Sequence, residues 1–230
     1  MDWNLNDLYG NIKSKKILND FSKLDKKALR FNNNFKNKIN NKISPNRLYE
    51  AIVELEKIYE GLGKISSYAS LNFAANTNNE KISQFYQSTS EKVSQIRKNL
   101  LFFFIDWNNI DSKNAKRLYK STKLAKYKNL LESERKYKPY LLNESEERIL
   151  DQKSLTSSRA FNRLFDETLN NIVFNFDSNG KVKKLSETQA LSLLYDKNRK
   201  VRLNAAKALT NGLNSEKRLI TFISLYNFKK

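Results

Sequence analysis

The stretch SPNRLYEAIVELEKIYEGLGKISSYA, residues 44–69, decides the fold class. Ser44 followed by Pro45 is a helix start, because serine caps free backbone N–H groups and proline fits the first helical position. One apolar stripe continues from there at steps of three and four residues, which is typical of a long amphipathic helix. Its members are Leu48, Ile52, Leu55, Ile58, Tyr59, Leu62, Ile65, Tyr68 and Ala69.

The neighbouring segments carry the same helical signal. Apolar side chains recur at helical steps over residues 14–35, over 80–107 after a connector at 76–79, and over 112–139 until Pro139. The 5 Gly and 2 Pro of the chain are too few for the many tight turns of a sandwich or barrel. The sequence therefore predicts an all-α fold of long antiparallel helices, arranged as a bundle or as stacked hairpins.

The remaining helices are interrupted by a single strand candidate. Residues 144–172 predict a short acidic helix and a stronger amphipathic one. Residues 173–183 hold two short runs around the turn sequence Asp177-Ser178-Asn179-Gly180, which predicts at most one small β-hairpin.

The end of the chain predicts a capped helix pair. Ser186 with Gln189 forms a capping box. A helix that begins near Asp196 is expected to end at Gly212, a residue type that favours C-terminal caps. Residues 218–228 are apolar on nearly all sides, so we expect them to be buried against something.

The absence of two residue types limits the chemistry. The chain has no histidine and no cysteine. Thiolate zinc sites, cysteine nucleophiles and Ser/His/Asp triads are therefore excluded for these residues. We predict no catalytic residue, no metal ligand and no cofactor here, while carboxylate-only chemistry remains open and substrate-binding residues are unknown.

The formal net charge of +19 raises the question of nucleic-acid binding. The excess is spread over three separated stretches, residues 1–43, 111–140 and 181–230, and consists of 32 Lys against 11 Arg. Specific readers of bases and phosphates favour arginine for its bidentate fork. We therefore expect non-specific affinity for polyanions and no specific nucleic-acid partner.

Two features bear on location. The longest apolar run, residues 100–105, is about a third of the ~18 residues that a membrane helix needs, so we predict a buried segment and no membrane partner. The first five residues, Met1-Asp2-Trp3-Asn4-Leu5, form no basic, apolar leader, which leads to the expectation of a cytoplasmic protein.

Three groups of polar or glycine residues have both a functional and a structural interpretation. Glu144, Glu146, Glu147 and Asp151 form a carboxylate cluster, but acidic groups at a helix start also offset the dipole. Arg159, Arg163, Arg199 and Arg202 have the spacing to clamp a carboxylate or phosphate, although such residues more often pair with acids on a neighbouring helix. Gly61 and Gly63 lack the rest of a nucleotide-binding fingerprint, which favours helix packing or a kink.

Several blocks, taken in order, resemble one family, oligoendopeptidase F, within the thimet-oligopeptidase-like zinc peptidases. They are WNLNDLY at residues 3–9, YEGLGKISSYA at 59–69, LNESEERIL at 142–150, KSLTSSRAFNRLFDE at 153–167 and LSLLYDKNRKVR at 191–202. The resemblance implies an amino-terminal helical region at 1–185 and the first helices of a metallopeptidase catalytic domain at 186–230. It also implies helices that wall a deep channel, which admits oligopeptides and excludes folded proteins.

The zinc motif of that family, His-Glu-x-x-His with a distant glutamate, has no position in this chain. The resemblance therefore implies an amino-terminal fragment, split product or decayed gene of a zinc metalloendopeptidase, which is inactive alone and whose possible partner is a carboxy-terminal half in trans. A stand-alone helical binding or scaffold protein is the second hypothesis. A basic protein that binds nucleic acid non-specifically is the third.

Overall fold

The computed structural model describes residues 4–178 and 180–227. Trp3, Asn179 and Phe228, which belong to segments singled out above, lie outside the described residues. The chain divides into two compact units, Met1–Lys153 and Ser154–Lys230, and each is described by itself. The boundary predicted between residues 185 and 186 comes from the family resemblance and not from the compactness of the units, so it stays a prediction.

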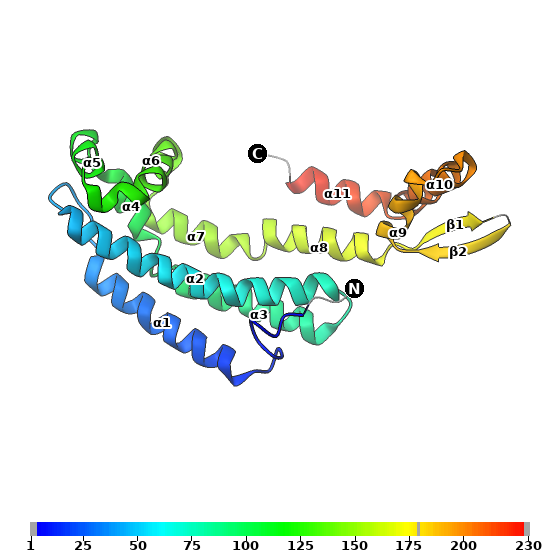
Figure 1. Ribbon diagram of the computed structural model, residues 1–230, viewed down its shortest axis with the longest axis horizontal. Helices are drawn as coiled ribbons and strands as arrows, with labels where there is room; N and C mark the ends of the chain where they lie inside the picture. Colours follow the sequence, from blue (N-terminus) through cyan, green and yellow to red (C-terminus); the bar gives the residue numbers. More distant parts are fainter. Residues whose placement is uncertain (1–3, 179, 228–230) are drawn as a thin grey trace. The chain divides into compact units, whose positions relative to one another are not determined.

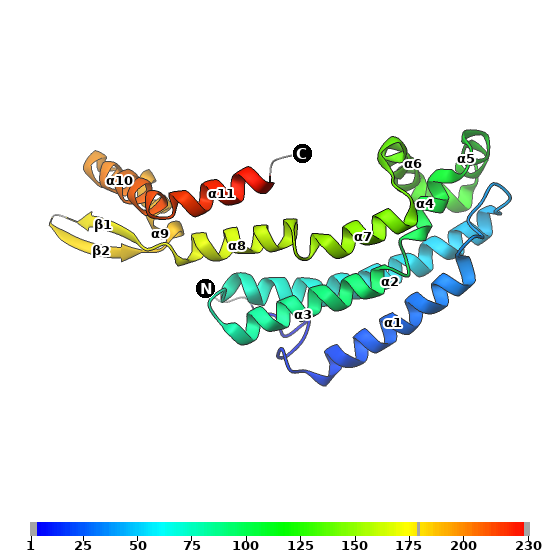
Figure 2. The same cartoon turned by 180° about the vertical axis from the view of Figure 1, so that it is seen from behind.

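Three long helices form the body of the first unit. They are α1 (Lys15–Phe35), α2 (Pro45–Ala75) and α3 (Glu80–Arg97), which lie side by side in both views (Figures 1 and 2). The Ser44 hydroxyl accepts a hydrogen bond from the Arg47 N–H at 3.2 Å, which confirms the predicted start of α2. The stripe of α2 is buried as expected, with Leu48, Ile58 and Ile65 fully enclosed. The all-α prediction is therefore confirmed for this unit.

Shorter elements follow α3 along the chain. They are α4 (Phe102–Asn109), α5 (Ser112–Tyr119), the 3-10 helix η1 (Thr122–Tyr127), α6 (Lys128–Lys136), the 3-10 helix η2 (Lys138–Tyr140) and α7 (Glu144–Ser154). Trp107 on α4 is fully buried, and its indole N–H donates to the Leu131 carbonyl on α6 at 3.0 Å. This bond gives a partner to the one polar group of the largest buried side chain in the described core.

Two helices that the sequence predicted as continuous are broken. A turn at residues 98–101 separates α3 from α4, and Ser121 in extended backbone separates α5 from η1. The first break has a packing reason, because Leu100, Phe102 and Phe103 are all buried. In one helix, residues 100 and 102 would point in nearly opposite directions, so the turn is needed to bury both.

The second unit combines helices with the predicted hairpin. Its elements are α8 (Ser158–Asn171), β1 (Phe174–Ser178), β2 (Lys181–Leu185), α9 (Glu187–Ser192), the 3-10 helix η3 (Leu193–Tyr195), α10 (Arg199–Ser215) and α11 (Lys217–Asn227). The two strands pair antiparallel, with Phe174 opposite Leu185 and Ser178 opposite Lys181. The predicted capping box is present, since Ser186 and Gln189 exchange hydrogen bonds. Within the described residues this hairpin is the single sheet.

Gly212 does not end its helix, contrary to the prediction. α10 continues to Ser215, and Gly212 is buried inside it. A Cβ atom built on Gly212 would lie 2.5 Å from Cδ1 of Phe174. The glycine is therefore needed for the close approach of α10 to β1 and not for a C-terminal cap.

The apolar final helix α11 is covered on one side. It packs against α8 within the second unit, and Ile223 is fully buried, while Phe222, Leu225 and Tyr226 are exposed. The segment is therefore packed against α8 on one side, as expected, while these three side chains are not covered by the described residues of this unit. Among the described residues, no helix combines the length and apolar character that crossing a bilayer requires.

Candidate functional site

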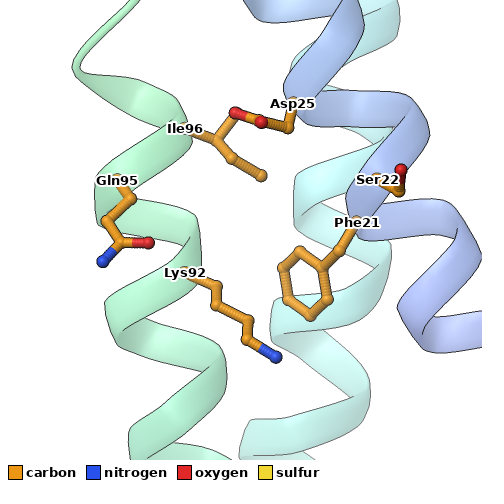
Figure 3. Close-up of a pocket in the computed structure, with 6 residues that line it drawn as sticks. All are labelled: Phe21, Ser22, Asp25, Lys92, Gln95 and Ile96. Atoms are coloured by element: carbon orange, nitrogen blue, oxygen red, sulfur yellow. The ribbon is translucent and has the colours of Figure 1, made fainter.

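A groove lies between α1 and α3 in the first unit (Figure 3). It has a cavity volume of about 350 Å³ and is lined by Phe21, Ser22 and Asp25 from α1 and by Lys92, Gln95 and Ile96 from α3. Phe21 and Ile96 are buried, and the other four side chains are exposed. The groove therefore has an apolar floor and a polar rim.

Lys92 defines one side of this groove. Figure 3 shows its side chain extending across the cavity toward Phe21. The Lys92 ammonium nitrogen lies 5.5 Å from the centroid of the Phe21 ring, within the range of a cation–π contact. A carboxylate at the rim, Asp25, lies on the opposite wall. The groove thus offers a positive group, a negative group and an apolar surface between them.

A second, smaller cavity continues the groove toward the start of α1. Its volume is about 160 Å³, and it shares Phe21 and Lys92 with the first cavity. The additional lining residues are Ile12, Lys13, Ser14, Ile17, Leu18, Phe85, Ser88 and Thr89. Such a surface can hold an apolar side chain next to polar backbone, which is the chemistry of binding rather than of bond cleavage.

A partly buried polar cluster lies where α2, α3 and α7 meet. Burial raises the pKa of Tyr59, and the neighbouring Arg97 guanidinium acts in the opposite direction. The Ser94 hydroxyl donates to Asp151 at 2.5 Å, which ties α3 to α7. A phenol with a raised pKa stays protonated near neutral pH, so Tyr59 can donate a hydrogen bond but cannot serve as a base. This cluster is therefore structural.

The acidic residues at the start of α7 have the structural role that their position indicates. The Glu146 N–H donates to the Asn143 side chain, and the Asn143 N–H donates to the Glu146 carboxylate, each at 3.0 Å. Glu144 accepts from the Lys36 ammonium at 2.6 Å, and Glu147 accepts from the Leu142 N–H at 3.2 Å. Within the described part of the chain, no group of three acidic side chains is placed to hold a metal ion.

The four arginines do not form one anion clamp. Arg163 bonds Glu167 on its own helix at 2.8 Å, and Arg202 donates to the carbonyl oxygens of Asp196 and Lys197 at 2.8 and 3.0 Å. Arg163 thus pairs with an acid of its own helix, and Arg202 bonds backbone carbonyls of the turn before α10. Arg159 lies with Arg163 on α8, whereas Arg199 lies at the first turn of α10.

The glycines of the 59–69 block lie within the unbroken α2 and form no phosphate-binding loop. A Cβ on Gly61 would lie 2.6 Å from Cδ2 of Leu24, so this glycine permits the contact between α1 and α2. Gly63 faces open space, with no atom within 4 Å of a Cβ built on it. The packing interpretation therefore holds for Gly61 alone.

Sequence reasoning assigned no residue to a binding site and missed the groove. The helical pattern over residues 14–35 predicts an apolar face that includes Phe21, and Phe21 is buried, whereas no pattern singles out Lys92. A groove depends on the distance between two helices that are 45 or more residues apart in sequence, and side-chain periodicity reports only one helix at a time.

Comparisons with known proteins agree with one another. Residues 106–174 match a family model for the amino-terminal region of M3 peptidases, described as Oligopeptidase F. Oligopeptidase PepF of Bacillus subtilis (strain 168) is 26% identical over 175 residues, a match that covers 72% of this chain and 25% of PepF. This chain thus spans about a quarter of the length of that relative.

A solved structure shares the fold. The crystal structure of oligoendopeptidase-F from Enterococcus faecium matches with a TM-score of 0.70 and 19% identity, and the match covers 94% of this chain and 40% of the other. The likeness in fold thus extends over both compact units, well beyond residues 106–174. On these grounds the chain is similar to the amino-terminal portion of oligoendopeptidase F proteins.

Proposed function

We propose that these residues form part of the helical wall of the substrate channel in an oligopeptide-hydrolysing zinc metalloendopeptidase of the oligoendopeptidase F type. The observation that carries the proposal is the match in fold over 94% of the chain to oligoendopeptidase-F of Enterococcus faecium. The groove between α1 and α3 is compatible with it, because an apolar floor with a polar rim suits peptide side chains and backbone. The substrates of the channel in this proposal are oligopeptides.

We further propose that the chain has no peptidase activity by itself. A zincin needs two histidines one turn apart to hold the metal and a glutamate to activate water. The chain contains no histidine, so the residues present do not fit a zinc ion of this kind. The zinc and its ligands would have to come from residues outside these 230, and no catalytic step can be assigned to the side chains described above.

The test measures zinc content and turnover of a quenched fluorogenic oligopeptide by the purified chain. The chain is then mixed with the portion of Enterococcus faecium oligoendopeptidase-F beyond the 40% covered here, expressed as a separate polypeptide. We expect neither stoichiometric zinc nor cleavage with the chain alone, and chelator-sensitive cleavage of oligopeptides, but not of folded proteins, with the mixture. Chelator-sensitive turnover by the chain alone, free of contaminating peptidase, would contradict its predicted inactivity. A mixture that associates but stays inactive counts against the channel role.

A further inference from the structure

An aromatic surface on the second unit has no cover among the described residues of that unit. α8 and α11 lie side by side in both views (Figures 1 and 2). The ring centroids of Phe222 and Tyr226 are 4.5 Å apart, and that of Phe161 lies 6.2 Å from Phe222 and 6.4 Å from Tyr226. We call Phe161, Leu164, Phe222, Leu225 and Tyr226 the α8–α11 face.

Most of this face is open to solvent. The exposed fractions are 37% for Leu164, 46% for Phe222, 57% for Leu225 and 61% for Tyr226. Ile223, on the same helix, is only 1% exposed. α11 therefore buries Ile223 while the α8–α11 face stays largely exposed. A contiguous exposed apolar patch of this kind marks a surface for interaction.

A cavity adjoins the same face. Its volume is about 360 Å³, and it is lined by Ser215, Glu216, Arg218, Leu219 and Phe222, at the start of α11. A flat aromatic patch next to a hollow is suited to a partner that inserts one large side chain, because buried anchors in pockets dominate binding energy. Arg218 and Glu216 at the edge of the cavity supply polar groups for a rim.

Charge argues against a second copy of this chain as the occupant. Residues 154–230 contain 14 Lys and Arg against 6 Asp and Glu. Two copies that met through this unit would each bring a net charge of +8 (14 − 6), which disfavours the encounter. The exposed apolar side chains and the positive net charge of the unit instead fit a partner that presents an apolar surface and carries a net negative charge.

We propose that the α8–α11 face is the docking surface for the remainder of an oligoendopeptidase F type polypeptide. This inference rests on the function proposed above and names the partner. Its basis is the uncovered α8–α11 face, the positive net charge of the second unit and the greater length of the similar proteins. This chain covers only 40% of oligoendopeptidase-F from Enterococcus faecium. The uncovered larger part of that polypeptide is the occupant to which the proposal commits.

The experiment uses that uncovered part of the Enterococcus faecium protein as the probe, added to the full 230-residue chain. Binding is measured by titration, and hydrogen exchange is resolved by segment. We expect a one-to-one complex in which amide exchange within 217–227 slows at least tenfold. Phe222→Glu is expected to weaken binding about a hundredfold, as loss of a central anchor does. Leu203→Glu is the matched control, because Leu203 is also an exposed apolar residue of this unit, 54% exposed on α10, and should leave binding unchanged.

Several results would overturn the proposal. Strong protection of residues 217–227 from hydrogen exchange in a monomer without the probe is one. Dimerisation of the chain that Phe222→Glu abolishes is another. Absence of binding to the probe, or equal binding by the two variants, also contradicts it. Failure of the proposed function has a different signature. A complex that is sensitive to Phe222→Glu but does not cleave peptides supports the docking surface and contradicts the channel role. Peptide cleavage by the mixture that Phe222→Glu does not reduce supports the channel role and contradicts the docking surface.

Discussion

At the scale of single residues, the two glycines of α2 show how position decides what a small side chain does. Gly61 and Gly63 are two residues apart in one helix, so they point to nearly opposite sides. Gly61 faces Leu24 of α1 at a distance that leaves no room for a methyl group, while Gly63 faces open space. A single sequence cannot separate these roles, because both residues interrupt the same helical pattern.

We predict that Gly63→Ala stabilises the first unit by about 0.5–1 kcal/mol, since alanine lowers the entropy of the unfolded chain and favours a helix. Gly61→Ala gains the same stabilisation but forces the Leu24 side chain to move. Overpacking of a core in this way costs ~1–3 kcal/mol of the free energy of unfolding. Urea unfolding followed by tryptophan fluorescence measures both, because Trp107 is buried in the core of this unit. Equal unfolding midpoints for the two variants would show that the Leu24 contact does not limit α2.

At the scale of elements, the second unit depends on the contact between α10 and the hairpin. Phe174 and Phe176 alternate with exposed residues along β1, and both are buried. Phe176 packs with Ala205 and Ala208 of α10, and Phe174 lies under Gly212. The hairpin is thus held by small residues on the helix that faces it, because small side chains let a helix approach the aromatic rings closely.

We predict that Gly212→Ala loosens this contact. A methyl group 2.5 Å from the fully buried Phe174 ring must displace the ring or the helix, at a cost of ~1–3 kcal/mol. Hydrogen exchange of α10 and β1 should therefore accelerate by about 5- to 150-fold. Asn211→Ala, at the exposed neighbouring position, is the control and should leave exchange the same or slower. Similar exchange in both variants would mean that α10 has room to shift at no cost.

At the scale of the whole molecule, the positive charge is shared by both units. Residues 1–153 contain 29 Lys and Arg against 18 Asp and Glu, and residues 154–230 contain 14 against 6. No single basic stripe follows from these counts; Arg163 bonds Glu167 on its own helix, and Arg202 donates to the Asp196 carbonyl. The charge therefore predicts solvated faces with general affinity for polyanions.

We predict that any binding to DNA or RNA is weak and indifferent to sequence. Its affinity should fall by about a hundredfold or more between low and physiological salt, because such binding rests on counterion release. Fluorescence anisotropy with duplexes of unrelated sequence at several salt concentrations is the measurement, with a neutral polymer as the control competitor. A preference of about 10³ for one sequence would place nucleic-acid recognition ahead of the peptidase relationship.

The sequence by itself determined the helical class, the caps at Ser44 and Ser186, the hairpin and the family resemblance. Helical periodicity, caps and the hairpin turn each depend on residues that are close in sequence. The family resemblance depends on the order of the matching blocks along the chain, which the sequence also contains. The absence of histidine and cysteine in these residues is equally a matter of composition.

Only the tertiary structure decided where helices break, which glycine packs against a neighbour, and which apolar residues remain uncovered. The turn before Phe102, the contact of Gly212 with Phe174 and the groove under Lys92 each involve residues brought together from distant segments. Side-chain periodicity shows that a face is apolar but not what lies against it. For Leu225 and Tyr226 on α11, burial depends on which surface is present to cover them, and that is a property of packing and not of the segment.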